Sequence, residues 1–481
     1  MIRHAHLLFI LAVTLASIMS KNLEAESFLG NGKANELFQA HCASCHGQQL
    51  EGGMAGSLLD DIWTTASTDE ALSHAIKFGL DGTNMPSWKS VLSDDDIRTL
   101  VLLIREKAHL AKQANATAVD VESTFTSRHH SFDIETMVDA QGIIWAIDFL
   151  PDESLIYSQR NGSLWLYNKN GHVKIEGTPQ VWHHDQGGLL DVAVHPEFTK
   201  NGWVYLSYAV KTGKNAEGKD TGTTAVVRGQ ITDNRWQQQE VIYLPEPSKH
   251  VNRGWHFGSR FAFKGPYLYF SIGDEGYKDT AQSLSHHSGK IHRIYDDGRI
   301  PEDNPFVGVP DAEPSVWTYG NRNPQGMTVN PFTNQLWSAE HGPRGGDELN
   351  LVLKANNYGW PVATFGMNYD GTSMKVPTHV DGVTAPVHQW TPSIAVSDIT
   401  FYSGDKFPQW KGNLFAGSLA FQQLHRLEIK NDQVVNDEIL LSGMGRIRDV
   451  TTGPDGYLYI AINDKVTSHY RVVALKPIAN Q

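Results

Sequence analysis

The strongest constraint on the fold of this chain is a motif that recurs six times: an apolar strand, a turn that usually contains proline, and a strand rich in Leu, Trp or Tyr. The copies are Phe149-Leu-Pro-Asp-Glu with Leu155-Ile-Tyr, Val194-His-Pro-Glu with Trp203-Val-Tyr, Phe263-Lys-Gly-Pro-Tyr-Leu-Tyr, Val329-Asn-Pro-Phe with Leu336-Trp, Phe407-Pro-Gln-Trp with Asn413-Leu-Phe, and Thr452-Gly-Pro-Asp-Gly-Tyr-Leu-Tyr. Six copies over about 350 residues predict six blades of roughly four strands each around a central channel, an all-β six-bladed β-propeller. A β-sandwich would need fewer repeats and a shorter chain.

Residues 27–110 have a different pattern, which predicts a small all-α domain ahead of the propeller. Ser93 is a good N-cap, and three aspartates follow it in the first turn of a predicted helix that carries apolar residues from Ile97 to Ile104. Residues 111–132 are rich in Ala, Thr, Ser and Lys without periodicity, which predicts a linker. The propeller is then expected to span residues 133–481. A chain of 481 residues is long enough for two such domains.

The first 25 residues are typical of a signal peptide. A basic start at Arg3 precedes an almost unbroken apolar run from Leu7 to Met19, which is too short for a comfortable membrane span of ~20 residues. An uncleaved anchor is the alternative. We expect export to the periplasm and no transmembrane segment after cleavage.

The net charge of −13 argues against nucleic acid as a partner, because phosphate binding needs clustered Lys and Arg.

The only two cysteines, Cys42 and Cys45, lie in a C-x-x-C-H motif that ends at His46. They cannot form the disulfide framework of an exported protein of this size. The motif predicts covalent attachment of haem c, with His46 as one iron ligand; a thioredoxin-like redox pair is the alternative. Met85 is the expected second ligand, whereas Met54 follows His46 too closely to reach over the ring easily. The segment from Leu37 onwards resembles small class I cytochromes c.

Four polar clusters interrupt the strand pattern beside strand ends, where propeller loops converge on one mouth of the channel. They are Asp185 to Leu190, Gly254 to Arg260, Gly320 to Gly326 with Glu340 to Glu348, and Gly445 to Asp449. Three arginines that converge on one place, Arg322, Arg446 and Arg448, indicate a ligand with several carboxylates. The alternative is that each arginine closes a loop by binding backbone carbonyls.

Residues from about 140 to the C-terminus resemble the PQQ-dependent soluble sugar dehydrogenases of the glucose/sorbosone dehydrogenase family, where PQQ is pyrroloquinoline quinone. The motifs that carry the resemblance are Gln186-Gly-Gly-Leu-Leu, His195-Pro-Glu-Phe, His256 before Gly258-Ser-Arg, Ile272-Gly-Asp274, Gly298-Arg-Ile-Pro-Glu-Asp-Asn-Pro, Gly320-Asn-Arg-Asn-Pro-Gln-Gly, His341-Gly-Pro, Asp347-Glu348-Leu-Asn, Asn357-Tyr358-Gly-Trp-Pro and Arg446-Ile-Arg448-Asp. They cover nearly all of the propeller.

The resemblance implies three catalytic residues. His256 would be the general base that takes the proton of the sugar C1 hydroxyl as hydride leaves for the quinone, a role that suits an unperturbed pKa of ~6.5. Asp274 would orient His256, although an ordinary turn aspartate is the alternative. Arg322 would lie at the quinone carbonyls and stabilise developing negative charge.

The resemblance also implies binding residues. Asn323, Arg446 and Arg448 would hold PQQ, Gln186 would line the substrate side, and Ser393 would make a weaker contact.

The resemblance also implies two calcium ions, and the oxygen ligands it gives them are of the kind that calcium prefers. The carbonyls of Gly342 and Pro343 would bind a Ca²⁺ that also contacts the quinone. Glu348 and Tyr358 would bind a second, structural Ca²⁺.

The chain departs from the glucose-oxidising members at Ala420, where those members carry a lysine, and it carries a cytochrome that simpler members lack. These differences leave the preferred sugar open.

The predicted function is oxidation of an aldose at C1 to the lactone, with electrons passing from PQQ to haem c and then to a respiratory acceptor. A calcium-dependent propeller lactonase and a non-catalytic sugar-binding propeller that carries a cytochrome are the alternatives. No P-loop or G-x-G-x-x-G opens a βαβ unit, which argues against a nucleotide cofactor.

Overall fold

The computed structural model describes residues 32–60, 62–63, 68–115, 124–464 and 467–478, and it divides into two compact units. The predicted signal peptide, residues 1–25, lies outside the described residues. Within the described part, no helix is both long and apolar enough to cross a membrane.

The N-terminal unit is helical, as predicted. Its helices are α2 (Gly32–His41), α3 (Ala43–His46), α4 (Asp69–Phe78) and α5 (Asp94–Asn115). Ser93 caps α5, since its Oγ accepts a hydrogen bond from the Asp96 amide at 3.2 Å while Asp96 Oδ2 accepts one from the Ser93 amide at 3.2 Å. The apolar face of α5 packs with Phe38 and Leu50 in one buried cluster, in which Leu100 and Leu103 are fully buried. Helix α5 ends inside the segment predicted as a linker.

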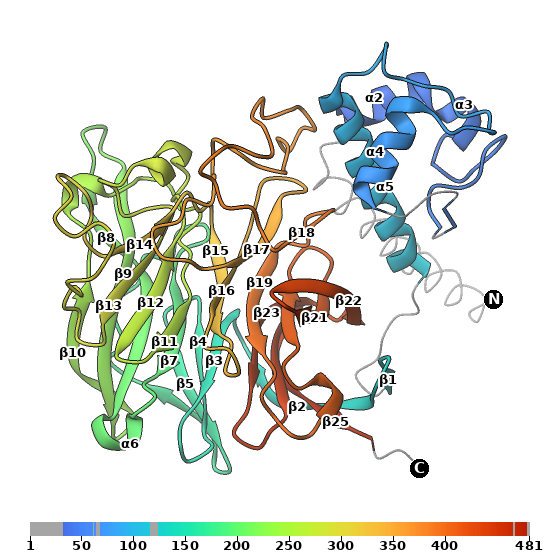
Figure 1. Cartoon of the computed structure of the whole chain (residues 1–481). Helices are drawn as coiled ribbons and strands as arrows, with labels where there is room; N and C mark the ends of the chain where they lie inside the picture. Colours follow the sequence, from blue (N-terminus) through green and yellow to red (C-terminus); the bar gives the residue numbers. More distant parts are fainter. Residues whose placement is uncertain (1–31, 61, 64–67, 116–123, 465–466, 479–481) are drawn as a thin grey trace, which may run out of the picture. The chain divides into compact units, whose positions relative to one another are not determined.

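The remainder forms six sheets, which confirms the predicted six-bladed β-propeller (Figure 1). Blades 1 to 3 contain β3 (Ile144–Phe149), β4 (Leu155–Gln159), β5 (Leu164–Asn168) and β6 (Gly171–Ile175); β7 (Leu189–Val194), β8 (Trp203–Lys214), β9 (Asp220–Thr232) and β10 (Arg235–Tyr243); and β11 (Phe261–Lys264), β12 (Tyr267–Ile272), β13 (Lys290–Tyr295) and β14 (Val316–Tyr319). Blades 4 and 5 contain β15 (Pro324–Val329), β16 (Leu336–Glu340), β17 (Asp347–Leu351) and β18 (His388–Trp390); and β19 (Val396–Phe401), β20 (Leu414–Ser418), β21 (Gln423–Lys430) and β22 (Gln433–Ser442). The short helices α6 (Phe198–Asn201), η1 (Pro247–Lys249), η2 (Lys278–Gln282) and η3 (Pro408–Trp410) lie in the connections.

Blade 6 joins the two ends of the propeller sequence in one sheet. Its strands are β23 (Arg446–Thr452), β24 (Leu458–Asp464), β25 (His469–Pro477), β2 (Ser131–Ala140) and β1 (Phe125–Thr126). Strand β2 pairs antiparallel with β25, and Figure 1 shows the two side by side. The first strands of neighbouring blades contact one another from β3 through β23 and back to β3, so the ring is closed.

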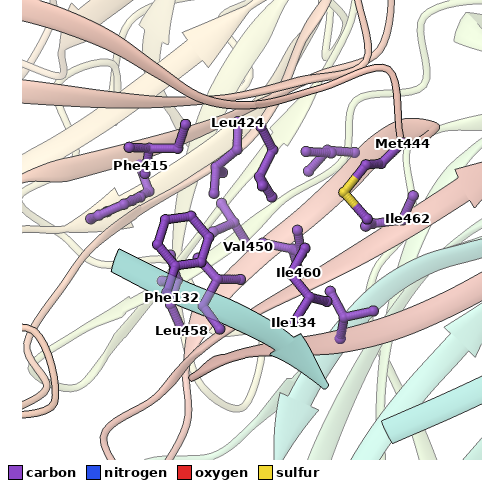
Figure 2. Packing of buried hydrophobic residues seen from close by; sticks show 14 of the residues in the cluster. Phe132, Ile134, Phe415, Leu424, Met444, Val450, Leu458, Ile460 and Ile462 are labelled. Atoms are coloured by element: carbon purple, nitrogen blue, oxygen red, sulfur yellow. The ribbon is translucent and has the colours of Figure 1, made fainter. Parts of the chain in front are cut away.

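Each copy of the sequence repeat falls on the hairpin between the first and second strands of one blade. The apolar residues of that hairpin point into the space between blades. Figure 2 shows one such layer, in which Phe132 of β2, Val450 of β23 and Leu458 of β24 pack with Phe415 of the preceding blade. All four side chains are buried, so the interface between blades 5 and 6 is a continuous apolar core.

Candidate functional site

The predicted propeller site residues come from loops at one end of the blades. In every blade this end holds the residues that precede the first strand and those that follow the second strand, because neighbouring antiparallel strands run in opposite directions. Gln186 precedes β7, His256 precedes β11 and Arg322 precedes β15, whereas Asp274 follows β12.

A cavity of about 190 Å³ lies among these loops. Of the predicted residues, it brings together Gln186, Arg446 and Arg448. The rest of its wall is formed by Ile143, Trp145, Arg160, Phe257, Gly258, Gln325, His341, Leu419 and Asn463. Three arginines, two on strand β23 and one directly after β4, therefore share one small, partly apolar cavity.

Burial shifts the pKa of two of these guanidinium groups, those of Arg446 and Arg448. It lowers the pKa of Arg446, and burial together with the charges of Arg446, Arg260 and Arg160 lowers the pKa of Arg448 to about 9. Arg448 Nη1 donates to Gln325 Oε1 at 2.9 Å, while its Nε is buried without a hydrogen-bond partner among the described residues. The cavity thus has more hydrogen-bond donors and more positive charge than its own acceptors and carboxylates offset. This property fits a ligand with several carboxylates.

His256 and Asp274 form a hydrogen-bonded pair beside this cavity. His256 Nδ1 lies 2.6 Å from Asp274 Oδ1, and the His256 amide donates to the Oε1 of Gln186, a wall residue, at 2.9 Å. Burial and the charge of Arg322 hold the pKa of His256 below its ordinary value. Burial alone would raise the pKa of Asp274, but the hydrogen bond and charge of His256, with the charge of Arg322, outweigh it and lower that pKa.

The backbone of His256 has a φ of 53°, in the left-handed region that non-glycine residues rarely adopt. Such a conformation costs about 1–3 kcal/mol and is found most often at functional sites. The chain thus holds this imidazole in an unfavourable backbone conformation beside the cavity.

Arg322 adjoins the cavity through His341. Its Nη1 donates to the carbonyl oxygens of His341 at 3.0 Å and Gly342 at 2.8 Å. Asn323 accepts a hydrogen bond from the Gly258 amide at 3.2 Å, and the Ser393 hydroxyl accepts one from the Gly346 amide at 3.0 Å. Neither Asn323 nor Ser393 lines the cavity, and each makes its hydrogen bond to a neighbouring loop instead.

In the helical unit, the two thiols and His46 lie on one short segment around α3. His46 Nδ1 is 3.1 Å from the Gly56 carbonyl oxygen. A carbonyl can only accept, so the proton is on Nδ1 and the Nε2 lone pair is left for a metal. Burial, with the neighbouring Cys45, raises the pKa of the Cys42 thiol to about 11, which is opposite to the lowered pKa of a reactive thioredoxin-type cysteine.

Met85 packs against the apolar cluster of this unit, whereas Met54 is 82% exposed. The local packing therefore favours Met85 over Met54 as the thioether that could face a haem. The residues present fit haem c, with two thiols and two candidate axial ligands in one small apolar domain.

Comparison with known proteins decides the family. The family described as Glucose / Sorbosone dehydrogenase matches residues 142–471. The chain belongs to this family. The family described as Cytochrome C oxidase, cbb3-type, subunit III matches residues 32–104, which confirms a cytochrome c domain ahead of the propeller.

Individual relatives agree with this family. The chain is 41% identical over 340 residues to the aldose sugar dehydrogenase YliI of Escherichia coli (strain K12), covering 69% of this chain and 90% of the relative. It is 29% identical over 264 residues to quinoprotein glucose dehydrogenase B of Acinetobacter calcoaceticus, covering 49% and 53%. A crystal structure of a glucose dehydrogenase superposes with a TM-score of 0.67 at 39% identity, covering 71% of this chain and 98% of the other. The predicted class of enzyme, a sugar dehydrogenase, is confirmed.

The predicted calcium ligands of this glucose/sorbosone dehydrogenase family member lie at two places. The Gly342 carbonyl accepts a hydrogen bond from the cationic Arg322, which engages one of its two lone pairs. Glu348 and Tyr358 line a second cavity of about 40 Å³. Among the described residues no group of three His, Cys, Asp or Glu could hold a metal ion.

Near that second cavity two carboxyl groups are buried together. Burial raises the pKa of Glu340 to about 7, and burial with the charge of Glu340 raises that of Glu348. Both share Asn350 Nδ2, at 3.3 and 3.4 Å. The Tyr358 hydroxyl donates to the Leu351 carbonyl at 2.5 Å and accepts from the Leu353 amide at 2.9 Å. A cation would relieve the repulsion between the two carboxylates; Tyr358 already has backbone partners.

Four residues of the cavity wall were not predicted as site residues from the sequence: Arg160, Trp145, Gln325 and His341. Arg160, His341 and Leu419 directly follow β4, β16 and β20, the second strands of three blades, and all three line the cavity. Alignment of the six repeats on their second strands would have placed Arg160 at a site position. Gly188 supports this placement, because a Cβ there would lie 1.9 Å from the Arg160 carbonyl oxygen.

Proposed function

We propose that the propeller oxidises aldose sugars at C1 to the lactone, with PQQ bound in the arginine-lined cavity and haem c of the same chain as the electron acceptor. The observation that carries the proposal is the hydrogen-bonded pair of His256 and Asp274 at the edge of a cavity with excess positive charge. The names of two relatives, an aldose sugar dehydrogenase and a quinoprotein glucose dehydrogenase, support the substrate class and the cofactor.

The cavity arginines would hold the carboxylates of PQQ. Arg446 and Arg448 lie on β23 of blade 6, and Arg160 approaches from blade 1. We propose that Arg160 supplies the cation that glucose-oxidising members place at the position of Ala420. Asn323 and Ser393 would contribute through the loops that they hold, and Gln186 would line the substrate side.

The bound quinone would supply a two-electron acceptor for hydride from the sugar. With Nδ1–H donated to Asp274, His256 presents Nε2 as the base for the C1 hydroxyl proton, and its lowered pKa keeps it neutral near neutral pH. Arg322, fixed by two carbonyls, would place positive charge where negative charge develops. Geometry and electrostatics are the contribution of the protein.

The helical domain would carry the haem, with Cys42 and Cys45 as thioether attachment points and His46 and Met85 as axial ligands. Electrons would leave one at a time, first to this iron and then to a respiratory acceptor in the periplasm. We propose residues 1–25 as the export signal, 27–110 as the cytochrome, 111–132 as the linker and 133–481 as the catalytic propeller. Calcium at Glu348 and Tyr358 is proposed as structural, and no step above depends on it.

The test is sugar-dependent reduction of the haem in the full-length, haem-loaded protein. Aldoses are added with and without PQQ, and the absorption of ferrous haem is followed. Reduction that requires both sugar and PQQ is the expected result. Reduction without PQQ, or lactone hydrolysis without any haem reduction, contradicts the proposal, and hydrolysis would favour the lactonase. Sugar binding without either reaction would favour a non-catalytic binding propeller.

A further inference from the structure

Trp360 lies in the long connection between β17 and β18, and its side chain reaches the proposed base pair. Its indole Nε1 donates a hydrogen bond to Asp274 Oδ2 at 2.7 Å. The other oxygen of that carboxylate, Oδ1, is 2.6 Å from His256 Nδ1 and also accepts from the Gly276 amide at 2.9 Å. Both oxygens of Asp274 are therefore engaged, one by the imidazole and one by the indole.

The same indole lies against Arg322. The guanidinium carbon is 5.3 Å from the centroid of the Trp360 ring, within the range of a cation–π contact. One side chain thus touches the residue that orients the base and the residue that would stabilise developing charge. Asp274 follows β12 in blade 3 and Arg322 precedes β15 in blade 4, so Trp360 ties together two loops from neighbouring blades.

The backbone of Trp360 is itself held firmly. Its amide donates to the Gly320 carbonyl at 2.8 Å, and its carbonyl accepts from Gln282 Nε2 at 2.7 Å. Gln282 and Asn357 exchange hydrogen bonds at 2.9 and 2.8 Å. Gly320 leaves room for this network, since a Cβ there would lie 2.1 Å from Asn357 Oδ1. The indole is consequently a fixed support and not a mobile contact.

We infer that Trp360 is a positioning residue for sugar oxidation, which holds Asp274 against His256 and packs against Arg322. The inference rests on the proposed function of His256. Its physical content is that the indole N–H shares the negative charge of Asp274 and fixes the plane of the carboxylate, so that His256 keeps its proton on Nδ1 and presents Nε2. Trp360 is not in the wall of the cavity, so the effect on PQQ binding is expected to be small.

Removal of the indole N–H is expected to shift the pKa of His256 in one direction. The charged and titratable groups that face His256 are Asp274, Arg322 and His341, and burial with nearby arginine charges keeps His341 neutral. Without Trp360, the charge of Asp274 is concentrated on the oxygen that faces the imidazole, which favours imidazolium. The pKa of His256 then rises, and the acidic limb of the kcat/KM profile moves to higher pH.

The test compares Trp360→Phe with Trp337→Phe in the full-length protein. Trp337 is a matched control because it is fully buried and its Nε1 has no hydrogen-bond partner among the described residues. We expect Trp360→Phe to lower kcat roughly 10- to 100-fold, to change the PQQ dissociation constant less than about twofold, and to move the acidic limb to higher pH. Trp337→Phe is expected to leave the limb in place. An unmoved limb in Trp360→Phe, or an equal shift in both variants, overturns the inference.

A second readout separates this inference from the proposed function. The titration of the His256 Cε1–H resonance, assigned with His256→Asn, reports the pairing of imidazole, carboxylate and indole without any turnover. A shift in Trp360→Phe supports the network even if wild-type protein fails to oxidise sugars, and no shift refutes the network even if it does. Should Trp360→Phe not fold, Gln282→Ala loosens the same indole; a smaller shift of the same sign is expected, and no shift overturns the inference.

Discussion

Arg260 and Arg448 are both buried arginines of the same propeller, and their surroundings are opposite. Arg260 Nη1 lies 2.8 Å from Asp191 and 2.7 Å from Asp449, and its Nε lies 3.1 Å from Asp398. These carboxylates more than offset the burial of Arg260 and raise its pKa, whereas burial lowers the pKa of Arg448 to about 9. Arg448 lies in the wall of the cavity with Arg446 and Arg160, and Arg260 does not.

The difference indicates that Arg260 has a structural role, whereas the charge of Arg448 is available to bind a ligand. A buried ion needs compensation from inside the protein or from a bound partner. The charge of Arg260 is compensated by three carboxylates, those of Asp191, Asp398 and Asp449. Burial raises the pKa of Asp191 to about 7, because the single positive charge of Arg260 is shared among the three carboxylates. The compensation of the cavity arginines is proposed to come from PQQ.

The comparison first predicts that chemistry and ligand binding can be separated at His256. His256→Asn removes the proposed base but none of the cavity cations, so turnover should fall by about 10²–10⁴-fold while PQQ affinity changes little. Steady-state haem reduction and PQQ titration measure the two effects. His129→Asn, at an exposed turn residue, is the control. Full turnover in His256→Asn would contradict the assignment of the base.

Arg260→Met should destabilise the fold strongly. It leaves three buried carboxylates without their cation, a change that costs about 3–5 kcal/mol for a broken buried pair. Urea unfolding of the haem-loaded protein measures the loss, with Arg299→Met, at a 72% exposed side chain, as the control. A stability equal to wild type would show that the acidic cluster does not depend on Arg260.

Arg448→Met should have the opposite effect on the ligand-free protein. The substitution removes an uncompensated buried charge and is expected to stabilise the PQQ-free fold by about 1–3 kcal/mol. Urea unfolding without PQQ is again the measurement. If Arg448→Met destabilises the protein as much as Arg260→Met does, the two arginines are both structural and the contrast between them fails.

Glu348→Gln tests calcium with a smaller effect. Because Glu340 and Glu348 repel each other, the neutral side chain should stabilise the protein by about 1 kcal/mol in the presence of a chelator. With Ca²⁺ the order should reverse, since only the wild type gains binding energy. Melting temperatures with and without Ca²⁺ give the answer, and Glu302→Gln at an exposed position is the control. No Ca²⁺ dependence in the wild type would refute this site.

The pH dependence is the mildest prediction. As the proposed base, His256 would act only when neutral, and burial together with the charge of Arg322 lowers its pKa. The neutral form therefore persists as pH falls below about 6.5, the ordinary value, and the acidic limb of kcat/KM should lie below that pH. Arg322→Gln should move the limb upwards. A wild-type acidic limb above pH 7 would show that bound cofactor or substrate raises the pKa of His256 by more than burial and Arg322 lower it.

The propeller was predictable because its signal is repeated. Six proline-containing hairpins each indicate the same local structure, so the number of blades can be predicted although the copies are unevenly spaced. The role of a buried arginine is not predictable in this way. Arg260 directly precedes the first strand β11 and Arg448 lies near the start of the first strand β23, so their sequence positions are similar. The partners of Arg260, however, lie 69 and 189 residues away at Asp191 and Asp449. Only closure of the ring brings them together.

The candidate site shows the same limit. Motif residues such as Gln186, Arg446 and Arg448 share the cavity, because they lie before or at the start of first strands that converge on the channel. Arg160, in the sequence Arg160-Asn-Gly, is indistinguishable from an ordinary turn residue until the second strands are aligned. Trp360 acts across two blades, and no spacing in the sequence relates it to Asp274.

The most direct test of the account is the dissociation constant of PQQ from the ligand-free propeller site of the full-length protein. It should be measured by equilibrium titration for wild type, Arg448→Gln and the exposed control Arg299→Gln. Loss of one charge-assisted hydrogen bond is worth about 1.5–3 kcal/mol, so Arg448→Gln should weaken binding on the order of 10- to 100-fold and Arg299→Gln should not. Equal affinity in all three proteins, or no PQQ binding by the wild type, would contradict the claim that the uncompensated arginines form the cofactor site.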